Sequence, residues 1–503
     1  MTTTNDLYAA REFEGMPIGG QWRAGSVGRA KVDTDPYHGD TLVEIPLADS
    51  NDVDEAYRLA RDAQRDWARR TPQQRAEVMR RAAQVMTDLS DHIIDWLVRE
   101  AGSTVAKARA EWLATRNDFL EAASYPHRMS GALLPADVPG KESRVYRRPL
   151  GVVGVISPWN WPMHLSNRSV APALAVGNAV VLKPAGDTPV TGGLLLAHVL
   201  REAGLPESLL SVIVGSGGTV GDAMVQHPIP RMVSFTGSTE VGVGIRQKAG
   251  TKKVAMELGG NGPLVVLDDA DLEYATEAAL FGTFFHQGQI CIRTNRIIVD
   301  DAVHDAFVDR FLARTRELQY GDPAKPDTDI GPVINASQLE SIQDKLVRGR
   351  DAGAEVLLAG DPTGPTGLVL PPHVVLANNS APPAAEEVFG PVGTVIRARG
   401  EENARDIAND TNYGLASAVF TTDVERGARF AAGIEAGMTH INDQTVNDEA
   451  NTAFGGEKDS GVGRFGGEWA IEEFTTDHWV SIQHEKRTFP FQRKGSTTPS
   501  AGV

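Results

Sequence analysis

The sequence of 503 residues predicts an α/β protein with two main domains, each built on a parallel sheet covered by helices. From residue 150 onward, short apolar and β-branched runs alternate with helical stretches, the pattern of parallel strands joined by helices. A second series of the same alternation begins near Gly260. The length agrees with this interpretation, because about 150 residues per domain gives two to four domains.

The predicted elements follow in chain order. Residues 1–50 predict short strands and turns, and Thr71, Pro72 and Gln74 form the start signal of a helix. Another helix begins at Ser90. The first alternating series has strands at 152–156, 179–182, 211–214 and 232–235, with helices at 189–203 and 239–248. The second has strands at 263–267 and 296–299, with helices at 272–285 and 303–318. Residues 361–386 are rich in Pro, Gly and Asn and predict surface loops.

Composition and charge exclude several classes of function. The chain carries 49 Lys and Arg against 66 Asp and Glu, a formal net charge of −17, which disfavours binding to nucleic acid or to an anionic membrane. The single cysteine permits no intramolecular disulfide and no four-cysteine site, so we expect no metal. The first 15 residues lack the basic and apolar regions of a secretory signal. We therefore expect a cytoplasmic protein.

Cys291 is the first candidate for chemistry. A lone cysteine is more often a small buried apolar residue than a nucleophile, so other segments must decide its role.

Asn160 follows a predicted strand, where its amide can donate to a developing oxyanion; the alternative is an ordinary turn. Glu257 ends a strand beside two glycines, where apolar surroundings raise the pKa of a carboxyl and suit it to act as a general base. The alternative there is a structural salt bridge.

Gly237 and Ser238 lie between a predicted strand and a predicted helix. Free backbone N–H groups at such a helix start bind anions, and the alternative is an ordinary helix cap. The usual dinucleotide fingerprint is absent, because Gly215, Gly217 and Gly221 have the wrong spacing.

Together these segments resemble the aldehyde dehydrogenase superfamily over nearly the whole chain. The residues that match, in order, are Asn160, Lys183, Gly237 and Ser238, Glu257, Cys291, Glu387 to Pro391, and Phe454 to Gly456. The resemblance implies an aldehyde dehydrogenase-like α/β fold with two Rossmann-like parallel-sheet domains and a small β element for oligomerisation. It implies a cofactor-binding domain at 1–125 and 149–258, a catalytic domain at 259–457, an oligomerisation element at 126–148 and 475–493, and a flexible tail at 494–503.

The resemblance also implies a mechanism and its residues. Cys291 is expected to attack the aldehyde carbonyl, with the oxyanion held by the Asn160 amide and the Cys291 backbone N–H. Hydride transfer to a nicotinamide would leave a thioester, which water activated by Glu257 hydrolyses to the carboxylic acid.

The cofactor implied by the resemblance is NAD. Lys183 is expected to reach the adenosine ribose, Ser238 the pyrophosphate and Glu387 the nicotinamide ribose, with Phe389 beside the ring. The full set of expected cofactor-binding residues is Ile156, Ser157, Trp159, Lys183, Gly215, Gly221, Phe235, Gly237, Ser238, Leu258, Glu387 and Phe389. Gly186 stands where many NAD-preferring members carry a glutamate, so use of NADP is also expected. Ser169 occupies the place of a lysine that many members use as a proton relay, which leaves Arg168 or water for that task.

The substrate expected from the resemblance is an aromatic aldehyde, because several segments are similar to the benzaldehyde and vanillin dehydrogenase branch. The residues expected to line the substrate tunnel are Trp161, Leu165, Arg168, Phe285, Ile290, Ile292 and Val446. This apolar, partly aromatic lining suits a flat ring, and a medium-chain aliphatic aldehyde fits it too. Arg168 leaves open a role in binding a semialdehyde carboxylate or a phenolate.

Two further functions and one assembly state follow as expectations. A coenzyme A-acylating enzyme is disfavoured by the presence of Glu257, and a non-catalytic relative is disfavoured because Cys291, Glu257 and Asn160 are all present. Residues 479–483 alternate as a strand. The resemblance implies that this last strand, with the segment around 126–148, pairs across a subunit interface, so we expect a homodimer or homotetramer. The only other partner expected is the small-molecule aldehyde.

Overall fold

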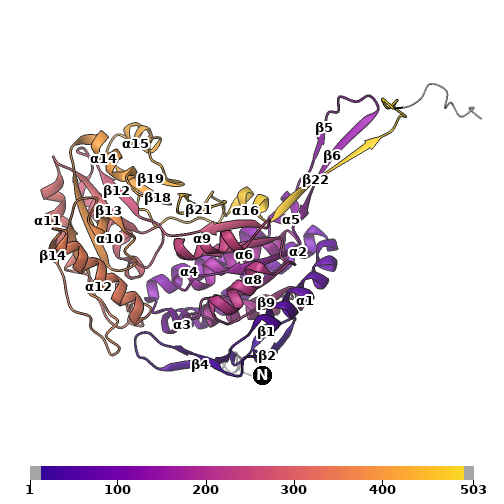
Figure 1. Cartoon of the computed structure of the whole chain (residues 1–503). Coiled ribbons are helices and arrows are strands. Elements are labelled where there is room, and N and C mark those ends of the chain that lie inside the picture. The colour runs from indigo at the N-terminus through magenta and orange to yellow at the C-terminus, as the bar shows by residue number, and fades with distance from the viewer. Residues whose placement is uncertain (1–12, 492–503) are drawn as a thin grey trace, which may run out of the picture.

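The computed structural model describes residues 13–491, and its two larger sheets occupy separate lobes (Figure 1). In the first lobe every strand pair is parallel except the β21–β11 edge. The strand order is β21 (Gly461–Val462), β11 (Lys253–Glu257), β10 (Met232–Thr236), β7 (Val152–Ile156), β8 (Ala179–Lys183) and β9 (Leu210–Val212). The four strands predicted for the first series are therefore present.

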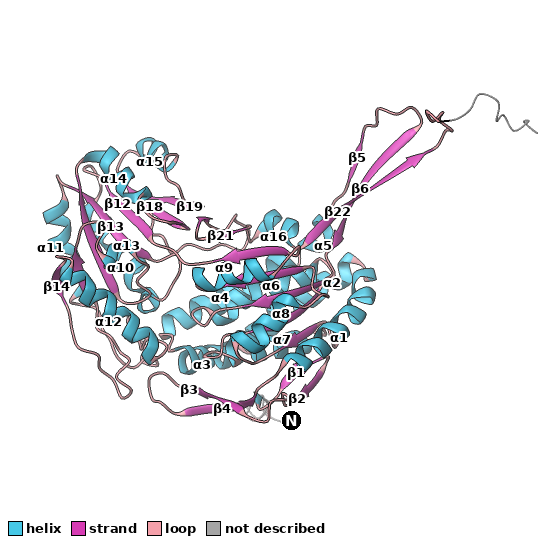
Figure 2. Ribbon diagram, viewed as in Figure 1, coloured by secondary structure: helices cyan, strands magenta, loops and turns pink. Residues whose placement is uncertain are grey.

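Helices pack around this sheet (Figure 2). They are α1 (Ser50–Arg69), α2 (Pro72–Asp88), α3 (Ser90–Ala101), α4 (Val105–Ala122), α5 (Tyr125–Arg128), α6 (Pro162–Ala175), α7 (Leu195–Glu202), α8 (Asp222–Gln226), α9 (Thr239–Lys248) and α16 (Gly467–Glu473). The predicted start signal of α2 is confirmed, because Thr71 and Gln74 make a reciprocal capping box. Two hairpins precede these helices, β1 (Met16–Ile18) with β2 (Gln21–Arg23) and β3 (Ala30–Thr34) with β4 (Thr41–Pro46).

The second lobe contains a seven-stranded sheet that is parallel except for the edge strand β14. Its order is β14 (Glu355–Leu358), β15 (His373–Leu376), β16 (Val392–Ala398), β13 (Thr294–Asp300), β12 (Gly262–Val266), β18 (Ala416–Phe420) and β19 (Met438–Ile441). The helices of this lobe are α10 (Leu272–Phe284), α11 (His304–Thr315), α12 (Ala336–Asp351), α13 (Pro382–Ala385), α14 (Gly400–Asn409) and α15 (Val424–Ala431).

The prediction of surface loops throughout 361–386 is wrong. Residues 373–376 form β15, which is largely buried and pairs in parallel with β16. Four residues between prolines and asparagines are too few for a periodic signal, so only packing in the sheet reveals this strand.

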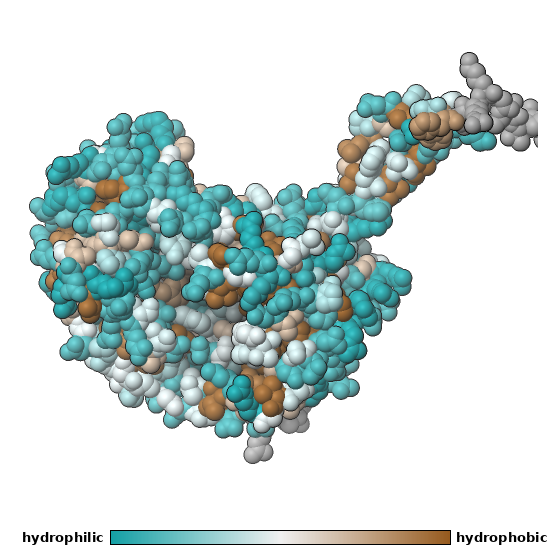
Figure 3. Space-filling view, viewed as in Figure 1, coloured by the Kyte–Doolittle hydropathy of each residue, from teal (hydrophilic) through white to brown (hydrophobic). Residues whose placement is uncertain are grey.

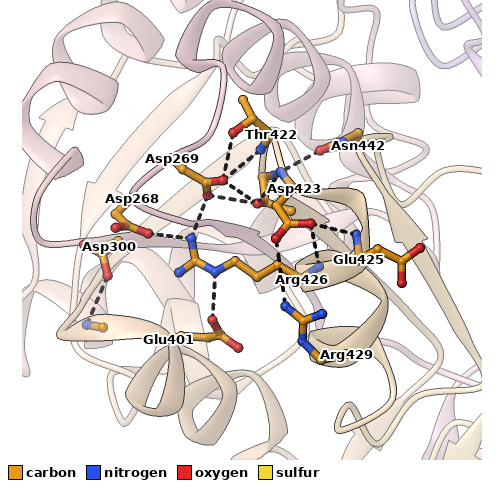
Figure 4. Close-up of polar contacts among 12 residues, drawn as sticks. Asp268, Asp269, Asp300, Glu401, Thr422, Asp423, Glu425, Arg426, Arg429 and Asn442 are labelled. Carbon is orange, nitrogen blue, oxygen red and sulfur yellow. Dashed lines mark hydrogen bonds and ion pairs between the residues drawn. The ribbon is translucent and has the colours of Figure 1, made fainter.

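A polar cluster ties the helices of the second lobe to the ends of its strands (Figure 4). Arg426 on α15 pairs with Asp269 and with Glu401 on α14, each at 2.8 Å. Asp269 also accepts hydrogen bonds from the backbone and side chain of Thr422. These contacts join α14 and α15 on the outer side of the lobe and belong to the scaffold.

A three-stranded arm projects from the body (Figure 1). It consists of β5 (Ala132–Leu134), β6 (Lys141–Pro149) and β22 (Thr475–Gln483), with β22 antiparallel to β6 along its whole length. The predicted strand at 479–483 is thereby confirmed. Apolar side chains gather on the arm surface (Figure 3), where Leu133 is 77% and Trp479 is 64% exposed. The predicted tail at 494–503 lies outside the described residues.

Within residues 13–491, no helix combines the length and the apolar character needed to cross a bilayer.

Candidate active site

The loop that carries Cys291 has an unusual backbone. His286, Gln287 and Gly288 all lie in the left-handed region, with φ of 51°, 56° and 68°. Such a run is costly for non-glycine residues and persists only where the surroundings enforce it. Here the Gln287 side chain donates to the carbonyls of Gly102 and Pro332, both at 2.8 Å. The site of Cys291 is therefore held by contacts to both lobes.

Asn160 lies beside this loop, as its predicted role requires. Its Nδ2 donates a 2.9 Å hydrogen bond to the carbonyl oxygen of Gln289, and its side chain is buried. An amide nitrogen has two hydrogens, so one remains to be donated. This arrangement brings a buried N–H donor to the neighbourhood of the cysteine.

Glu257 ends β11 and is 1% exposed. Neither carboxyl oxygen has a hydrogen-bond partner among residues 13–491. Burial raises the pKa of Glu257 to about 8, against the opposing charges of Arg168 and Arg464. The raised pKa expected from the sequence is confirmed, and it gives the carboxyl a proton affinity suited to general base catalysis near neutral pH.

The pKa of the Cys291 thiol is also raised. Burial, reinforced by the charge of Glu257, raises its pKa to about 12. The thiol therefore keeps its proton in the free protein and must lose it as it reacts.

Two glycines allow the segments of the site to approach. A Cβ on Gly260 would lie 2.1 Å from the Cys291 carbonyl oxygen, and one on Gly259 would lie 2.7 Å from Glu387 Oε2. The Gly260 N–H donates to Glu387 at 2.8 Å. The Gly259 and Gly260 pair thus connects the general-base candidate to the cysteine loop and to Glu387, as only glycine can at this distance.

Cys291 opens onto a first cavity of about 310 Å³ between the lobes. Its lining comprises Pro158, Trp159, Asn160, Leu165, Thr236, Gly237, Ser238, Leu258, Gly259, Cys291, Gln338, Ser341, Lys345, Glu387 and Phe389. The Ser238 side chain makes no capping bond at the start of α9, so the first-turn N–H groups remain available to an anion. The Trp159 and Phe389 rings meet edge to face at 5.4 Å. The donors, flat apolar surfaces and carboxyl suit a dinucleotide.

Six of the twelve predicted cofactor residues line this cavity: Trp159, Gly237, Ser238, Leu258, Glu387 and Phe389. The other six lie outside its lining: Ile156, Ser157, Lys183, Gly215, Gly221 and Phe235. Phe235 lies against Gly237, where a Cβ would approach its ring to 2.6 Å, so it supports the backbone. Lys183 ends β8 near Gly221, and its Nζ donates to the Pro184 carbonyl at 3.3 Å.

Sequence reasoning missed the wall supplied by α12. Gln338, Ser341 and Lys345 all line the first cavity. Their i, i+3, i+7 spacing places them on one face of the helix. A polar stripe along α12 was therefore the sequence signal that could have identified this wall. Gln338 also donates to the Phe389 carbonyl at 2.6 Å.

A second cavity of about 180 Å³ reaches the other side of Cys291. Its lining comprises Ala110, Ala114, Asn160, Trp161, His164, Leu165, Arg168, Ile290, Cys291, Ile292, Val446, Asp448 and Phe454. Six of the seven predicted substrate residues are among these. The exception is Phe285, which stacks on Phe281 at 4.5 Å and packs behind Trp161 at 6.3 Å. Phe285 therefore supports the wall of the cavity instead of forming it.

Arg168 lines the second cavity as predicted, and it does so as the partner in an ion pair. Its side chain is 8% exposed, forms an ion pair with Asp448, and lies 3.9 Å over the Phe454 ring. Its charge is thus balanced inside the protein, which disfavours the predicted capture of a substrate carboxylate. The neighbouring Ser169 bonds to Ser234 Oγ at 2.9 Å, away from the ion pair.

Comparisons with known proteins agree with this geometry. The model of the "Aldehyde dehydrogenase family" matches residues 22–480. A vanillin dehydrogenase of Corynebacterium glutamicum is 47% identical over 93% of this chain and 97% of its own. The solved structure of an NAD-dependent benzaldehyde dehydrogenase from the same species is 43% identical, with a TM-score of 0.87 over 95% of this chain and 98% of that one.

A third similar protein is the structure of a salicylaldehyde dehydrogenase from Pseudomonas putida G7, solved with salicylaldehyde. It is 36% identical, with a TM-score of 0.92 over 95% of this chain and 99% of that one. The expected fold class is confirmed by these neighbours.

Proposed function

The chain belongs to the aldehyde dehydrogenase family, and from this premise we propose that it oxidises aromatic aldehydes to carboxylic acids with NAD⁺. The observation that carries the proposal is the pair of cavities that meet at Cys291. One is lined by Trp161, Ile290, Ile292 and other apolar groups that suit a single flat ring. The vanillin, benzaldehyde and salicylaldehyde dehydrogenases to which the chain is similar support the same substrate class.

In the proposed mechanism Cys291 is the nucleophile. The thiol releases its proton to solvent as its sulfur attacks the aldehyde carbon. The oxyanion then accepts hydrogen bonds from Asn160 Nδ2 and from the Cys291 backbone N–H, the expected donors. Burial leaves Glu257 protonated below about pH 8. The fraction of enzyme in which Glu257 is an ionised carboxylate, able to activate water, therefore rises as the solution becomes more alkaline.

The first cavity fits NAD⁺ on the evidence of its unsatisfied groups. The free N–H groups at the start of α9 suit the pyrophosphate, and Glu387 would hold the nicotinamide ribose. We propose Lys183 for the adenosine ribose, in accord with its place near Gly221 and its single weak bond. Hydride acceptance is the chemistry that the bound nicotinamide supplies. Glu257 then activates the water that hydrolyses the Cys291 thioester and releases the acid.

The cofactor choice follows from open space near the ribose site. A Cβ on Gly186 would meet nothing within 4 Å, and Asp187 next to it contacts Asn335 at 3.4 Å. Position 186 is a glycine, so there is no glutamate side chain there to repel a 2′-phosphate. We therefore propose that the enzyme prefers NAD⁺ and also accepts NADP⁺ to a smaller extent.

The domain assignment remains our proposal, with cofactor binding at 1–125 and 149–258 and catalysis at 259–457.

We propose that two or four copies of the chain associate through the arm, and the exposed side chains of Leu133 and Trp479 support this. We also propose a cytoplasmic location, supported by a nucleophilic thiol that must stay reduced.

The test is steady-state kinetics with benzaldehyde, vanillin and hexanal, each with NAD⁺ and NADP⁺, followed through the absorbance of the reduced cofactor. We expect kcat/KM to be at least tenfold higher for one of the aromatic aldehydes than for hexanal, a preference of about 1.4 kcal/mol. A preference for hexanal would discard the aromatic assignment. Product analysis with and without coenzyme A separates hydrolysis from acyl transfer, and only the free acid agrees with the role of Glu257.

A further inference from the structure

Two buried side chains of opposite charge keep polar atoms that no partner satisfies. Glu257 is almost fully buried, and neither of its carboxyl oxygens accepts a hydrogen bond from residues 13–491. Arg168 is also buried, and its Nη1 has no hydrogen-bond partner in the same range. Arg168 lines the second cavity together with Cys291. Unpaired buried groups are rare in folded proteins, so a free donor and a free acceptor close to a reactive thiol point to a function.

Two consecutive residues join these side chains. The guanidinium carbon of Arg168 lies 3.9 Å from the centre of the Phe454 ring. The next residue is Gly455, where a Cβ would approach Glu257 Oε1 to 3.1 Å. The same short backbone segment therefore has Arg168 packed on its first residue and Glu257 against its second.

Arg464, which follows β21, is the other cation that acts on Glu257. Both arginines lower the pKa of the Glu257 carboxyl against the larger effect of burial, which raises it to about 8. Arg464 is engaged elsewhere, because it pairs with Glu457 and its Nη1 donates to two backbone carbonyls at 2.9 Å each. A quarter of its side chain is exposed, where water weakens its field. Arg168 is therefore the cation with the stronger hold on Glu257.

The remaining charged groups around Arg168 occupy its other terminal nitrogen. Nη2 forms the ion pair with Asp448 and lies 3.0 Å from His164 Nε2. Asp118 on α4 and the Cys291 thiol are the further titratable groups whose charges act on Arg168. The contacts of Nη2 leave the Nη1 donor free.

We propose that Arg168 is a positioning residue that keeps Glu257 ionised while the Cys291 thioester is hydrolysed. The inference rests on the proposed function and assigns a residue to its last step. In that step the Glu257 carboxylate takes a proton from water, the water oxygen bonds to the thioester carbon, and the carbon–sulfur bond breaks. The carboxylic acid leaves, and the Cys291 sulfur takes the proton back. A fixed positive charge favours the carboxylate, because it offsets the penalty that burial places on the ionised form.

The experiment measures the steady-state rate against pH at saturating benzaldehyde and NAD⁺. Arg168→Met removes the charge, so we expect the midpoint of the alkaline rise to move up by about one pH unit. At pH 7 turnover should then be about tenfold slower. Rapid mixing should still show a burst of reduced cofactor, because hydride transfer precedes the step that needs Glu257. Arg168→Lys keeps the charge and should return most of the midpoint shift.

A second variant covers the case in which Arg168→Met fails to fold, since that change leaves Asp448 without its cation. Arg168→Met combined with Asp448→Asn removes both charges of the pair and should show the same alkaline shift. Arg128→Met is the matched control. It removes an ion-paired arginine on α5 that lines neither cavity at Cys291, so its midpoint should equal that of the wild type.

Two results would overturn the inference. One is a midpoint that stays at its wild-type pH in the double variant. The other is an alkaline shift of full size in Arg168→Lys, which would show that the charge of Arg168 is not the cause. A wild-type enzyme that oxidises no aldehyde, or whose rate shows no alkaline rise, would instead reject the proposed function or the role of Glu257 in it.

Discussion

Lys107 donates a 2.7 Å hydrogen bond to the backbone carbonyl of Asn160 while it pairs with Glu111, one turn along the same helix. Both side chains are fully buried. Glu111 in turn accepts the N–H groups of Met163 at 2.9 Å and His164 at 3.3 Å, in the first turn of α6. One buried ion pair therefore holds both ends of the turn that presents the Asn160 amide.

Removing this support should lower both stability and catalysis. Lys107→Met leaves Glu111 buried without its cation, which typically costs about 3–5 kcal/mol of unfolding free energy. We expect kcat to fall about tenfold as well, because a small displacement of the Asn160 amide weakens oxyanion binding. Denaturant unfolding and steady-state kinetics measure the two effects.

The double variant Lys107→Met with Glu111→Gln is the control for this prediction. It removes both charges, so we expect it to recover a large part of the lost stability. Equal stability of the single variant and the wild type would show that the pair does not support the turn.

Replacing the nucleophile should stop the reaction at its first step. Cys291→Ala is expected to abolish aldehyde oxidation and to retain cofactor binding, measured by calorimetric titration with NAD⁺. The companion variant Asn160→Ala should reduce kcat by about 10²–10³-fold, the usual effect of losing one oxyanion donor. Turnover of Cys291→Ala above background would reject the nucleophile assignment.

Replacing the general base should separate the two halves of the reaction. With Glu257→Gln we expect a burst of reduced cofactor followed by slow turnover, because the thioester forms and then resists hydrolysis. Rapid-mixing absorbance measurements resolve the burst. An unaltered steady-state rate in this variant would remove Glu257 from hydrolysis.

The pH profile tests the same residue without substitution. The pKa of Glu257 is raised to about 8, so the active carboxylate is scarce below that pH and dominant above it. We expect the steady-state rate to rise from about pH 7 and to level off above about pH 8. The Glu257→Gln enzyme should lack this rise, and a wild-type rate that falls over the same interval would contradict the assignment.

The arm should control assembly. Trp479→Asp places a charge at a side chain that is 64% exposed on β22, and we expect it to shift the protein toward monomers in sedimentation analysis. Val424→Asp on α15 is the control, because that side chain is similarly exposed at 58% but lies on the body. Identical assembly of wild type and Trp479→Asp would exclude the arm as the interface.

Local patterns predicted the residues whose roles depend on neighbours in sequence. Strand ends and helix starts have clear signals, which placed Glu257 at the end of its strand and the Gly237 and Ser238 pair before α9. The raised pKa of Glu257 also followed from its apolar neighbours. The α12 wall and the short strand β15 were missed, since each is defined by packing against distant segments.

The sequence by itself determined the α/β class and the alternation of strands and helices, because these depend on short-range periodicity. The resemblance to the aldehyde dehydrogenases, carried by several motifs in order, supplied the proposed reactive residues. Only the tertiary structure decided the state of Arg168. Its partner Asp448 lies 280 positions away, and that contact changes an anion-binding candidate into a balanced ion pair. The tertiary structure likewise places Phe285 behind Trp161, where it supports the cavity wall instead of lining the cavity. Charge balance and burial arise where distant segments pack together, so no local pattern encodes them.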